Sequence, residues 1–383
     1  MMKPKYSDET KKKIFNAFPF FPDEDIDEIL HVIRRILKGE QKLTRGPLVE
    51  EFENGFSRYV DAEHSIAVHS CTSALEIILR YFQVENHEVI VPAQTFIATA
   101  NAVENAGGKP VFADIDAETL CLSAELIAPR ITPQTKGVIL VNMLGMIPPD
   151  LDQIVELCKK HHLFLIEDSA HSIGAAYHGK KSGNLTDAAV FSFFSTKIMA
   201  TGEGGMITTN HPDLADFARS IRNHGLDQKN IDCRFPGTNV RLDEIRSILG
   251  IIQLRRLNEF LTKRRKIAQK YKSALDLAEG LSTTSVPEYI HHSYWKFPVF
   301  VSAKQHLDKM KQIFFGNGIE VSAPYDPPCH LHSYYKKKYG YKPGTLPNAE
   351  NLLKRYFCLP VHADLSESDT DRVVNNIFES TKY

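Results

Sequence analysis

The sequence predicts an α/β fold in which a mostly parallel, seven-stranded sheet is flanked by helices and followed by a smaller C-terminal α+β domain. Short apolar runs of strand length alternate with amphipathic helical segments, the order that a parallel sheet with helical crossovers requires. The strand candidates are mostly apolar along their length, as expected for a sheet covered on both faces. A chain of 383 residues also exceeds what one ordinary core supports, so we expect two domains.

The first two thirds of the chain contain the elements of the predicted large domain. Residues 23–38 place isoleucine and leucine on one helical face, and residues 48–60 form a second amphipathic pattern. Further helical patterns cover residues 72–82, 95–107 and 151–162. The strand candidates are residues 64–70, 87–93, 109–115, 137–144, 163–168, 188–193 and 205–210.

The last third of the chain has a different organisation, which indicates a second domain. We expect a large domain over residues 1–253 and a small α+β domain over residues 254–383, joined by a long helix at 242–275. The predicted elements of the small domain are a strand at 294–301, a helix at 303–318, a loop rich in proline, tyrosine and histidine at 323–347, and a final helix capped by SESD at 366–369.

Composition and charge exclude several classes of function. The formal net charge is −1, so no overall field favours nucleic acid or an anionic membrane, and no apolar run is long enough to span a bilayer. The six cysteines are scattered without a CxxC pair, which predicts neither a metal site nor a disulfide framework. No secretory signal is recognisable after the basic residues near the N-terminus, so we expect a cytoplasmic protein with reduced thiols.

Polar residues follow several predicted strands, at the sheet edge where ligands of α/β proteins collect. Thr72 and Ser73 open a helix after strand 64–70, and their hydroxyls with the free backbone N–H groups form either a phosphate site or an ordinary N-cap. Asp168 follows the apolar run of strand 163–168. It either caps a following helix or faces a cationic ring nitrogen, and His171 would share its face of a helical turn.

Two further strand ends carry an aromatic ring and a lysine. Phe96 follows strand 87–93 and either joins the core or lies flat against an aromatic ligand. Lys197 and Ser192 lie between an apolar run and the sequence GEGG. Lys197 either extends to water or serves as a buried, reactive amine. The GEGG glycines are expected to supply positive φ for a tight turn, because no phosphate-loop motif is present.

Together these groups describe a site for pyridoxal 5′-phosphate. A carboxylate suits the pyridine nitrogen, an aromatic ring suits the ring face, a helix N-terminus suits the phosphate, and a lysine suits the aldehyde. No metal site is expected.

Sequence blocks along nearly the whole chain resemble the DegT/DnrJ/EryC1/StrS family of sugar aminotransferases, within the fold-type I pyridoxal-phosphate enzymes. The most specific block is FSFFSTKIMATGEGG, residues 191–205, which follows LIEDSAHSIGA at 165–175. Other matching blocks are LTRGPLVEEFE, EVIVPAQTFIATANAV, RNHG, GTNVRLDEIRSILGIIQL and LPVHADLSESD.

The resemblance implies roles for individual residues. Lys197 matches the lysine that forms a Schiff base with the cofactor, Asp168 the partner of the pyridine nitrogen, and Phe96 the residue that stacks on its ring. Thr72, Ser73 and Ser192 match phosphate-binding positions. Asn239 matches an asparagine that reaches the phosphate of the neighbouring subunit, which implies a homodimer with shared active sites. His171 stands where many members have glutamine, and Cys71 where many have glycine.

The resemblance also implies a reaction. The amino group of glutamate would pass to a keto sugar and give an amino sugar for surface polysaccharide or glycoconjugate synthesis, as in lipopolysaccharide. The GEGG version resembles members that aminate nucleotide-linked 4-keto-6-deoxyhexoses. A 3-keto sugar, an inosose or a small keto-phosphate remains an alternative acceptor. A sugar dehydratase is a further alternative, but that sister group replaces the lysine with histidine. Candidates to meet a diphosphate are Arg222, His224, Lys229, Arg234, His330 and Tyr334, each otherwise an ordinary loop residue.

Overall fold

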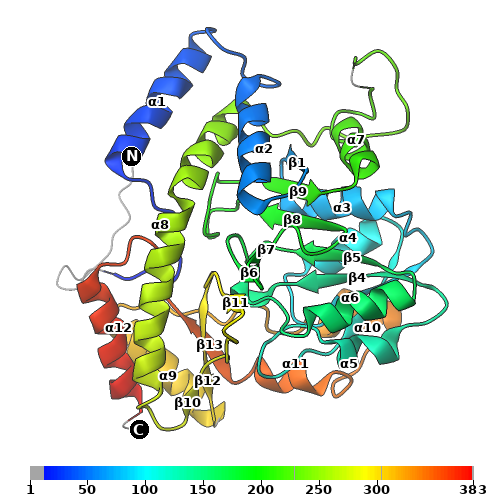
Figure 1. Ribbon diagram of the computed structural model, residues 1–383. Helices are drawn as coiled ribbons and strands as arrows, with labels where there is room; N and C mark the ends of the chain where they lie inside the picture. Colours follow the sequence, from blue (N-terminus) through cyan, green and yellow to red (C-terminus); the bar gives the residue numbers. More distant parts are fainter. Residues whose placement is uncertain (1–12, 228, 303, 382–383) are drawn as a thin grey trace.

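A seven-stranded sheet forms the centre of the molecule, as the sequence predicts (Figure 1). The computed structural model describes residues 13–227, 229–302 and 304–381. Six strands run parallel to one another, and β9, between β1 and β8, runs antiparallel to both. The strands, in spatial order, are β1 (His64–Val68), β9 (Gly205–Thr209), β8 (Ala188–Ser192), β5 (Phe164–Asp168), β4 (Thr135–Val141), β2 (Glu88–Pro92) and β3 (Lys109–Ala113).

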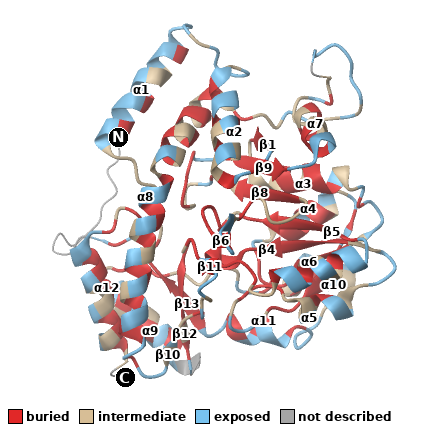
Figure 2. Cartoon of the chain, in the orientation of Figure 1, coloured by how far each residue is buried: buried red, intermediate tan, exposed pale blue. Residues whose placement is uncertain are grey.

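Helices flank the sheet on both faces (Figure 1). On one face α3 (Cys71–Tyr81) packs between α4 (Ala98–Asn105) and α7 (Pro212–Ile221), and on the other face α5 (Ala124–Ile127) packs against α6 (Leu151–Lys160). This arrangement follows from right-handed crossovers, because the chain moves in opposite directions along the sheet before and after β3. The strands are buried throughout most of their length (Figure 2), which explains their apolar sequences.

The N-terminal helices pack against the long helix α8 (Glu244–Leu275). Both α1 (Asp23–Leu37) and α2 (Pro47–Val60) contact it (Figure 1). Pro47 begins α2 at a position where its missing N–H costs nothing. The carboxylate of Glu244 accepts hydrogen bonds from the backbone N–H groups of Gly46 and Leu48, both at 2.8 Å, and so joins the start of α2 to the start of α8.

A second, smaller core lies in the C-terminal third. A three-stranded sheet of β10 (Leu281–Ser282), β12 (Phe297–Val301) and β13 (Tyr356–Leu359) packs with α9 (Lys304–Gly316) and α12 (Glu367–Ser380). The strand predicted at 294–301 begins only at Phe297, because Tyr294 has a φ of 51° and breaks the extended backbone. Ser366 and Asp369 form a capping box at the start of α12, as SESD predicts.

Some C-terminal elements return to the large sheet. Helix α10 (Ser333–Tyr339) carries Tyr335, whose ring packs edge-on against Phe112 of β3 at 5.1 Å, and α11 (Pro347–Leu352) also joins the main core. A further small sheet joins β11 (Ile290–His291) to β6 (Ala176–Tyr177) and β7 (Lys180–Lys181). The predicted boundary at residue 253 falls inside the continuous helix α8 and stays a prediction.

The described part of the chain contains no helix long and apolar enough to cross a membrane. It also contains no group of three or more histidine, cysteine, aspartate or glutamate residues arranged to hold a metal ion. All six cysteines are free. The expectation about a secretory signal concerns the N-terminal residues 1–12, which lie outside the described residues.

Candidate active site

A cavity of about 520 Å³ opens at the carboxyl ends of the parallel strands. Residues that follow β1, β2, β5 and β8 line it, and residues of the C-terminal third close it. Six of the predicted site residues line this cavity: Thr72, Phe96, Asp168, His171, Ser192 and Lys197. Ser73 and Asn239 do not. The sheet therefore brings most of the predicted groups together from segments that are far apart in the sequence.

Lys197 lies in a turn after β8, where its backbone N–H donates to the carbonyl of Phe194 at 2.8 Å. The residue is partly buried, and its Nζ lies 4.3 Å from the centre of the Trp295 ring. Burial lowers the pKa of the Lys197 amine from 10.5 to about 8, with Cys71 and Asp168 opposing the shift and Lys296 adding to it. Near neutral pH a minor fraction of the amine is therefore neutral, and so nucleophilic and basic, but a far larger fraction than for an ordinary lysine.

Asp168 ends β5 and is only 5% exposed. Its Oδ2 accepts a hydrogen bond from Thr99 Oγ1 at 2.8 Å, and its Oδ1 accepts one from the backbone N–H of Ala170 at 3.2 Å. Burial raises the pKa of the carboxyl, although both hydrogen bonds and Lys197 oppose the shift. No lysine, arginine or histidine of the described chain forms an ion pair with it. A buried carboxylate without a cation suits a protonated ring nitrogen.

His171 stacks on the ring of Trp295, with centroids 3.7 Å apart and an angle of 11° between the planes. Its Nε2 is 3.0 Å from the hydroxyl of Tyr325, and its carbonyl accepts a hydrogen bond from Ser293 Oγ. Burial, together with the charges of Lys197 and Lys296, holds the pKa of His171 well below 6.5, so the ring is neutral. Within the described residues its Nδ1 is buried and has no hydrogen-bond partner.

The chain after β5 differs from the sequence expectation. Residues 170 and 171 form a turn, and the next regular element is the short strand β6. The interpretation of Asp168 as a helix cap is therefore wrong, as is the shared helical turn of Asp168 and His171. His171 reaches the cavity through the turn, which the Oδ1 bond to Ala170 stabilises.

The start of α3 has the geometry of a helix N-terminus at the cavity. Ser70 is the N-cap, and its Oγ accepts a hydrogen bond from the backbone N–H of Ser73 at 3.2 Å. The side chain of Ser73 is mostly buried and bonds to Ser70, whereas Thr72 faces the cavity together with Ser192. The N-cap interpretation thus applies to Ser70, and Thr72 and Ser192 have hydroxyls available for a phosphate.

The GEGG glycines serve two purposes rather than the single one expected. Gly202 has a φ of +85°, as a tight turn requires. A Cβ on Gly205 would instead lie 2.5 Å from the carbonyl carbon of Ser70 and 2.6 Å from the nitrogen of Cys71. A Cβ on Gly204 would lie 2.7 Å from Thr201 Oγ1. Gly205 therefore allows β9 to approach the start of α3 closely, whereas Gly204 allows a close approach to Thr201.

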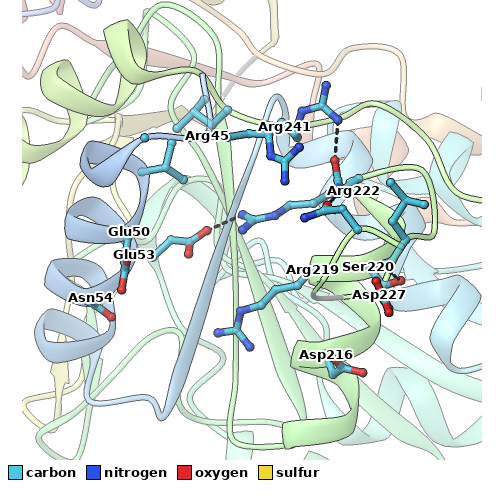
Figure 3. Close-up of a pocket in the computed structure, with 16 residues that line it drawn as sticks. Arg45, Glu50, Glu53, Asn54, Asp216, Arg219, Ser220, Arg222, Asp227 and Arg241 are labelled. Carbon is cyan, nitrogen blue, oxygen red and sulfur yellow. Dashed lines mark hydrogen bonds and ion pairs between the residues drawn. The ribbon is translucent and has the colours of Figure 1, made fainter. Parts of the chain in front are cut away.

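Phe96 and Asn239 lie at the edges of this arrangement. Phe96 is 58% exposed at the cavity, with its ring 6.1 Å from that of Tyr325. Asn239 is exposed and pairs through an isolated antiparallel bridge with Asn223. This bridge borders a second cavity of about 440 Å³, where arginine side chains from the α1–α2 loop, α7 and the loop between α7 and α8 converge (Figure 3). These are Arg45, Arg219, Arg222 and Arg241.

None of the six diphosphate candidates lines the first cavity. Arg222 donates to Glu53 (Figure 3) and to the carbonyl of Ala67, and Arg234 pairs with Asp216. His330 is fully buried against Glu350, and the Tyr334 hydroxyl donates to Glu104. His224 and Lys229 are exposed. Within one chain, four of the six are thus engaged in contacts of their own.

Sequence reasoning missed three residues that shape the first cavity: Thr99, Trp295 and Tyr325. Thr99 lies within the predicted helix at 95–107, but nothing in the pattern marks it as a partner of Asp168. Trp295 is the single tryptophan of the chain, and Tyr325 lies in the loop rich in proline and tyrosine. The single tryptophan and the tyrosine-rich loop were the sequence features that could have pointed to Trp295 and Tyr325.

Comparison with known proteins agrees with this geometry. The model of the DegT/DnrJ/EryC1/StrS aminotransferase family matches residues 23–378. The chain belongs to this family. It is 38% identical over 335 residues to a GDP-perosamine synthase of Caulobacter vibrioides, covering 86% of this chain and 89% of the relative. It is 30% identical over 385 residues to a UDP-4-amino-4-deoxy-L-arabinose–oxoglutarate aminotransferase of Shewanella sediminis, covering 94% and 96%.

Among solved structures, a putative sugar aminotransferase of Streptococcus pneumoniae, Spr1654 in its PLP form, superposes with a TM-score of 0.89 at 26% identity. The match covers 97% of this chain and 99% of that one. The protein is thus a transaminase that depends on pyridoxal phosphate, as the sequence predicts. The Asp168 carboxyl, which has hydrogen bonds but no ion pair in the described residues, the helix N-terminus of α3 and the partly neutral Lys197 amine fit that cofactor.

Proposed function

We propose that this sugar aminotransferase moves an amino group from glutamate to a nucleotide-linked 4-keto-6-deoxyhexose. The observation that carries the chemistry is the Lys197 amine in the same cavity as the buried Asp168 carboxylate. The substrate class rests on the two nucleotide-sugar relatives and on the GEGG block. The location in the cytoplasm and the use of the product in surface polysaccharide or glycoconjugate are further parts of the proposal.

Lys197 and Asp168 would have separate roles in the reaction. When bound, pyridoxal phosphate supplies an electron sink for the carbanion formed at the α-carbon of the amino donor. Lys197 would hold the cofactor covalently and, once displaced, take the α-proton on its Nζ, which its lowered pKa permits. Asp168, oriented by Thr99, would hold the proton on the ring nitrogen.

Other residues would bind and orient the cofactor. His171 is neutral and would donate a hydrogen bond toward the phenolic oxygen, while Phe96 would cover the ring face. Thr72 and Ser192 would bind the phosphate with the N-terminus of α3, and Ser73 would contribute through its position in the first turn. Asn239 is exposed and does not line the cavity of its own chain, which supports a homodimer in which it serves the partner's phosphate.

The test is a substrate screen with the amino-loaded enzyme. The purified protein is treated with glutamate, freed of excess donor and mixed with single keto sugars while the visible absorbance of the cofactor is followed. Return of the absorbance with a nucleotide-linked 4-keto-6-deoxyhexose, and formation of the amino sugar by mass spectrometry, would support the proposal. A response only to a 3-keto sugar, an inosose or a small keto-phosphate would show that the proposed acceptor is wrong and that the responding compound is the acceptor class instead. Lys197→Met, which has no amine, is the control for signals that arise without turnover.

A further inference from the structure

Trp295 contacts both Lys197, the proposed base, and the neutral imidazole of His171. Its ring stacks on His171 at 3.7 Å, and Nζ of Lys197 lies 4.3 Å from the centre of the same ring. Its indole N–H donates a hydrogen bond of 2.8 Å to the carbonyl of Thr196, the residue before Lys197. One side chain therefore touches the backbone and the amine of the lysine turn as well as the imidazole.

Trp295 reaches this place from the small C-terminal sheet. It lies two residues before β12 (Phe297–Val301) and is only 5% exposed. The guanidinium of Arg264, on α8, donates to the carbonyls of Tyr294 and Trp295, at 3.0 and 3.3 Å. These bonds hold the backbone on either side of the indole, so the ring has little freedom to leave the cavity wall.

The position of the ring has an electrostatic consequence. The face of an indole attracts a cation, so contact with Trp295 stabilises the protonated amine of Lys197 relative to the neutral one. Burial and the nearby Lys296 act in the opposite direction. Other titratable neighbours of Lys197 are Cys71 on α3, Asp168 on β5 and His171 in the turn after β5. Lys296 also contacts the indole directly, with its Nζ 5.0 Å from the ring centre. The protonated amine is the form that Lys197 takes after accepting a proton, and the indole offers that form a defined place beside the cavity.

We propose that Trp295 is a positioning residue for the transamination: it fixes the plane of the His171 ring and holds the protonated Lys197 amine in place between proton transfers. The inference rests on the proposed role of Lys197 as the base. It assigns to the small domain a direct influence on the reacting amine, through one side chain.

Trp295 is the single tryptophan of the chain, so the tryptophan emission of the full-length, cofactor-free protein reports on the contacts of this one ring, those with Lys197 and with Lys296. We expect its emission to change between about pH 6 and about pH 10 with a midpoint near the lysine pKa of about 8. The change should disappear in Lys197→Met. In Lys296→Met it should persist with a higher midpoint, because a neighbouring cation is removed. An emission that does not titrate, or that titrates equally in Lys197→Met, would overturn the proposal.

Kinetics of the holoenzyme provide the second measurement. Trp295→Leu should lower kcat for glutamate by about a hundredfold, with a much smaller change in KM. The reason is that the substitution misplaces Lys197 and His171 but leaves the binding of glutamate largely intact. Trp295→Phe, which keeps an aromatic face but loses the bond to Thr196, should recover about a tenth of the lost rate. In cofactor-free Trp295→Leu, the pH midpoint for uptake of pyridoxal phosphate by Lys197 should fall by about half a unit to one unit.

A matched control is Phe297→Leu, which removes part of a buried ring from the C-terminal core, close to Trp295 in the sequence, at a residue that does not line the cavity. It should leave the uptake midpoint and kcat near the wild-type values. Unchanged kcat and uptake midpoint in Trp295→Leu would refute the positioning role while leaving the proposed function intact. Turnover retained by Lys197→Met would instead refute the proposed function.

Discussion

The hydroxyl of Thr99, at the start of α4, donates a 2.8 Å hydrogen bond to the carboxylate of Asp168, at the end of β5. The other carboxylate oxygen accepts from the backbone of Ala170. Both bonds favour the ionised carboxylate, as does the charge of Lys197, whereas burial opposes ionisation and no cation of the described residues forms an ion pair with it. When this carboxyl is ionised, its buried negative charge therefore costs the protein stability, a cost that a cationic cofactor ring would offset.

Asp168→Asn should separate stability from activity. Because burial raises the folded-state pKa of Asp168, its contribution to stability is present at low pH and is lost as pH rises through that pKa. Above it, the neutral amide should make the cofactor-free protein more stable than the wild type, while turnover falls by at least about a hundredfold. Urea unfolding followed by Trp295 emission, at acidic and neutral pH, measures the first effect. A variant that is less stable than the wild type at neutral pH would contradict this account.

The lowered pKa of Lys197 should control how fast the protein takes up its cofactor. Only the neutral amine attacks an aldehyde, so the uptake rate in cofactor-free protein should rise with pH and level off above about 8. An ordinary surface lysine would give a midpoint near about 10. Stopped-flow absorbance after addition of pyridoxal phosphate measures the rate. The prediction fails if the rate still rises steeply well above pH 8, or if Lys197→Arg takes up the cofactor equally well.

The sheet and most of the cavity could be predicted from sequence because both depend on local patterns. Apolar runs identify strands, and polar residues at the ends of parallel strands must meet at one edge. The stack of His171 on Trp295 and the bond of His171 to Tyr325 could not be predicted, since these contacts join residues far apart in the sequence through irregular loops. The helix-cap alternative for Asp168 and the helical turn shared with His171 were wrong for a related reason: a buried carboxylate caps a turn as readily as a helix.

Gly205→Ala should disturb the cofactor site through the backbone. The new Cβ would lie 2.5–2.6 Å from backbone atoms of Ser70 and Cys71, so β9 or the start of α3 must move. We expect a loss of about 1–3 kcal/mol in the free energy of unfolding and weaker binding of pyridoxal phosphate. Gly316→Ala is the control, because nothing lies within 4 Å of its added Cβ and it belongs to α9. Equal stability and cofactor affinity in the two variants would show that the close approach of β9 to α3 has no role.

Mixed oligomers can test whether Asn239 serves a neighbouring subunit. Lys197→Ala removes the reacting amine of its own cavity, whereas Asn239→Ala would remove a phosphate contact from the cavity of the partner. In a mixed dimer of the two variants, the cavity with the intact Lys197 belongs to the Asn239→Ala chain and receives Asn239 from the Lys197→Ala chain, so one of its two sites is complete. Co-expression with two different affinity tags isolates such dimers.

We expect the mixed dimer to recover about half of the wild-type activity while both parent variants remain weak, because one hydrogen bond to a charged group contributes about 1.5–3 kcal/mol. If Asn239 served its own chain, the mixed dimer would contain no complete site and its activity would not exceed the average of the parents.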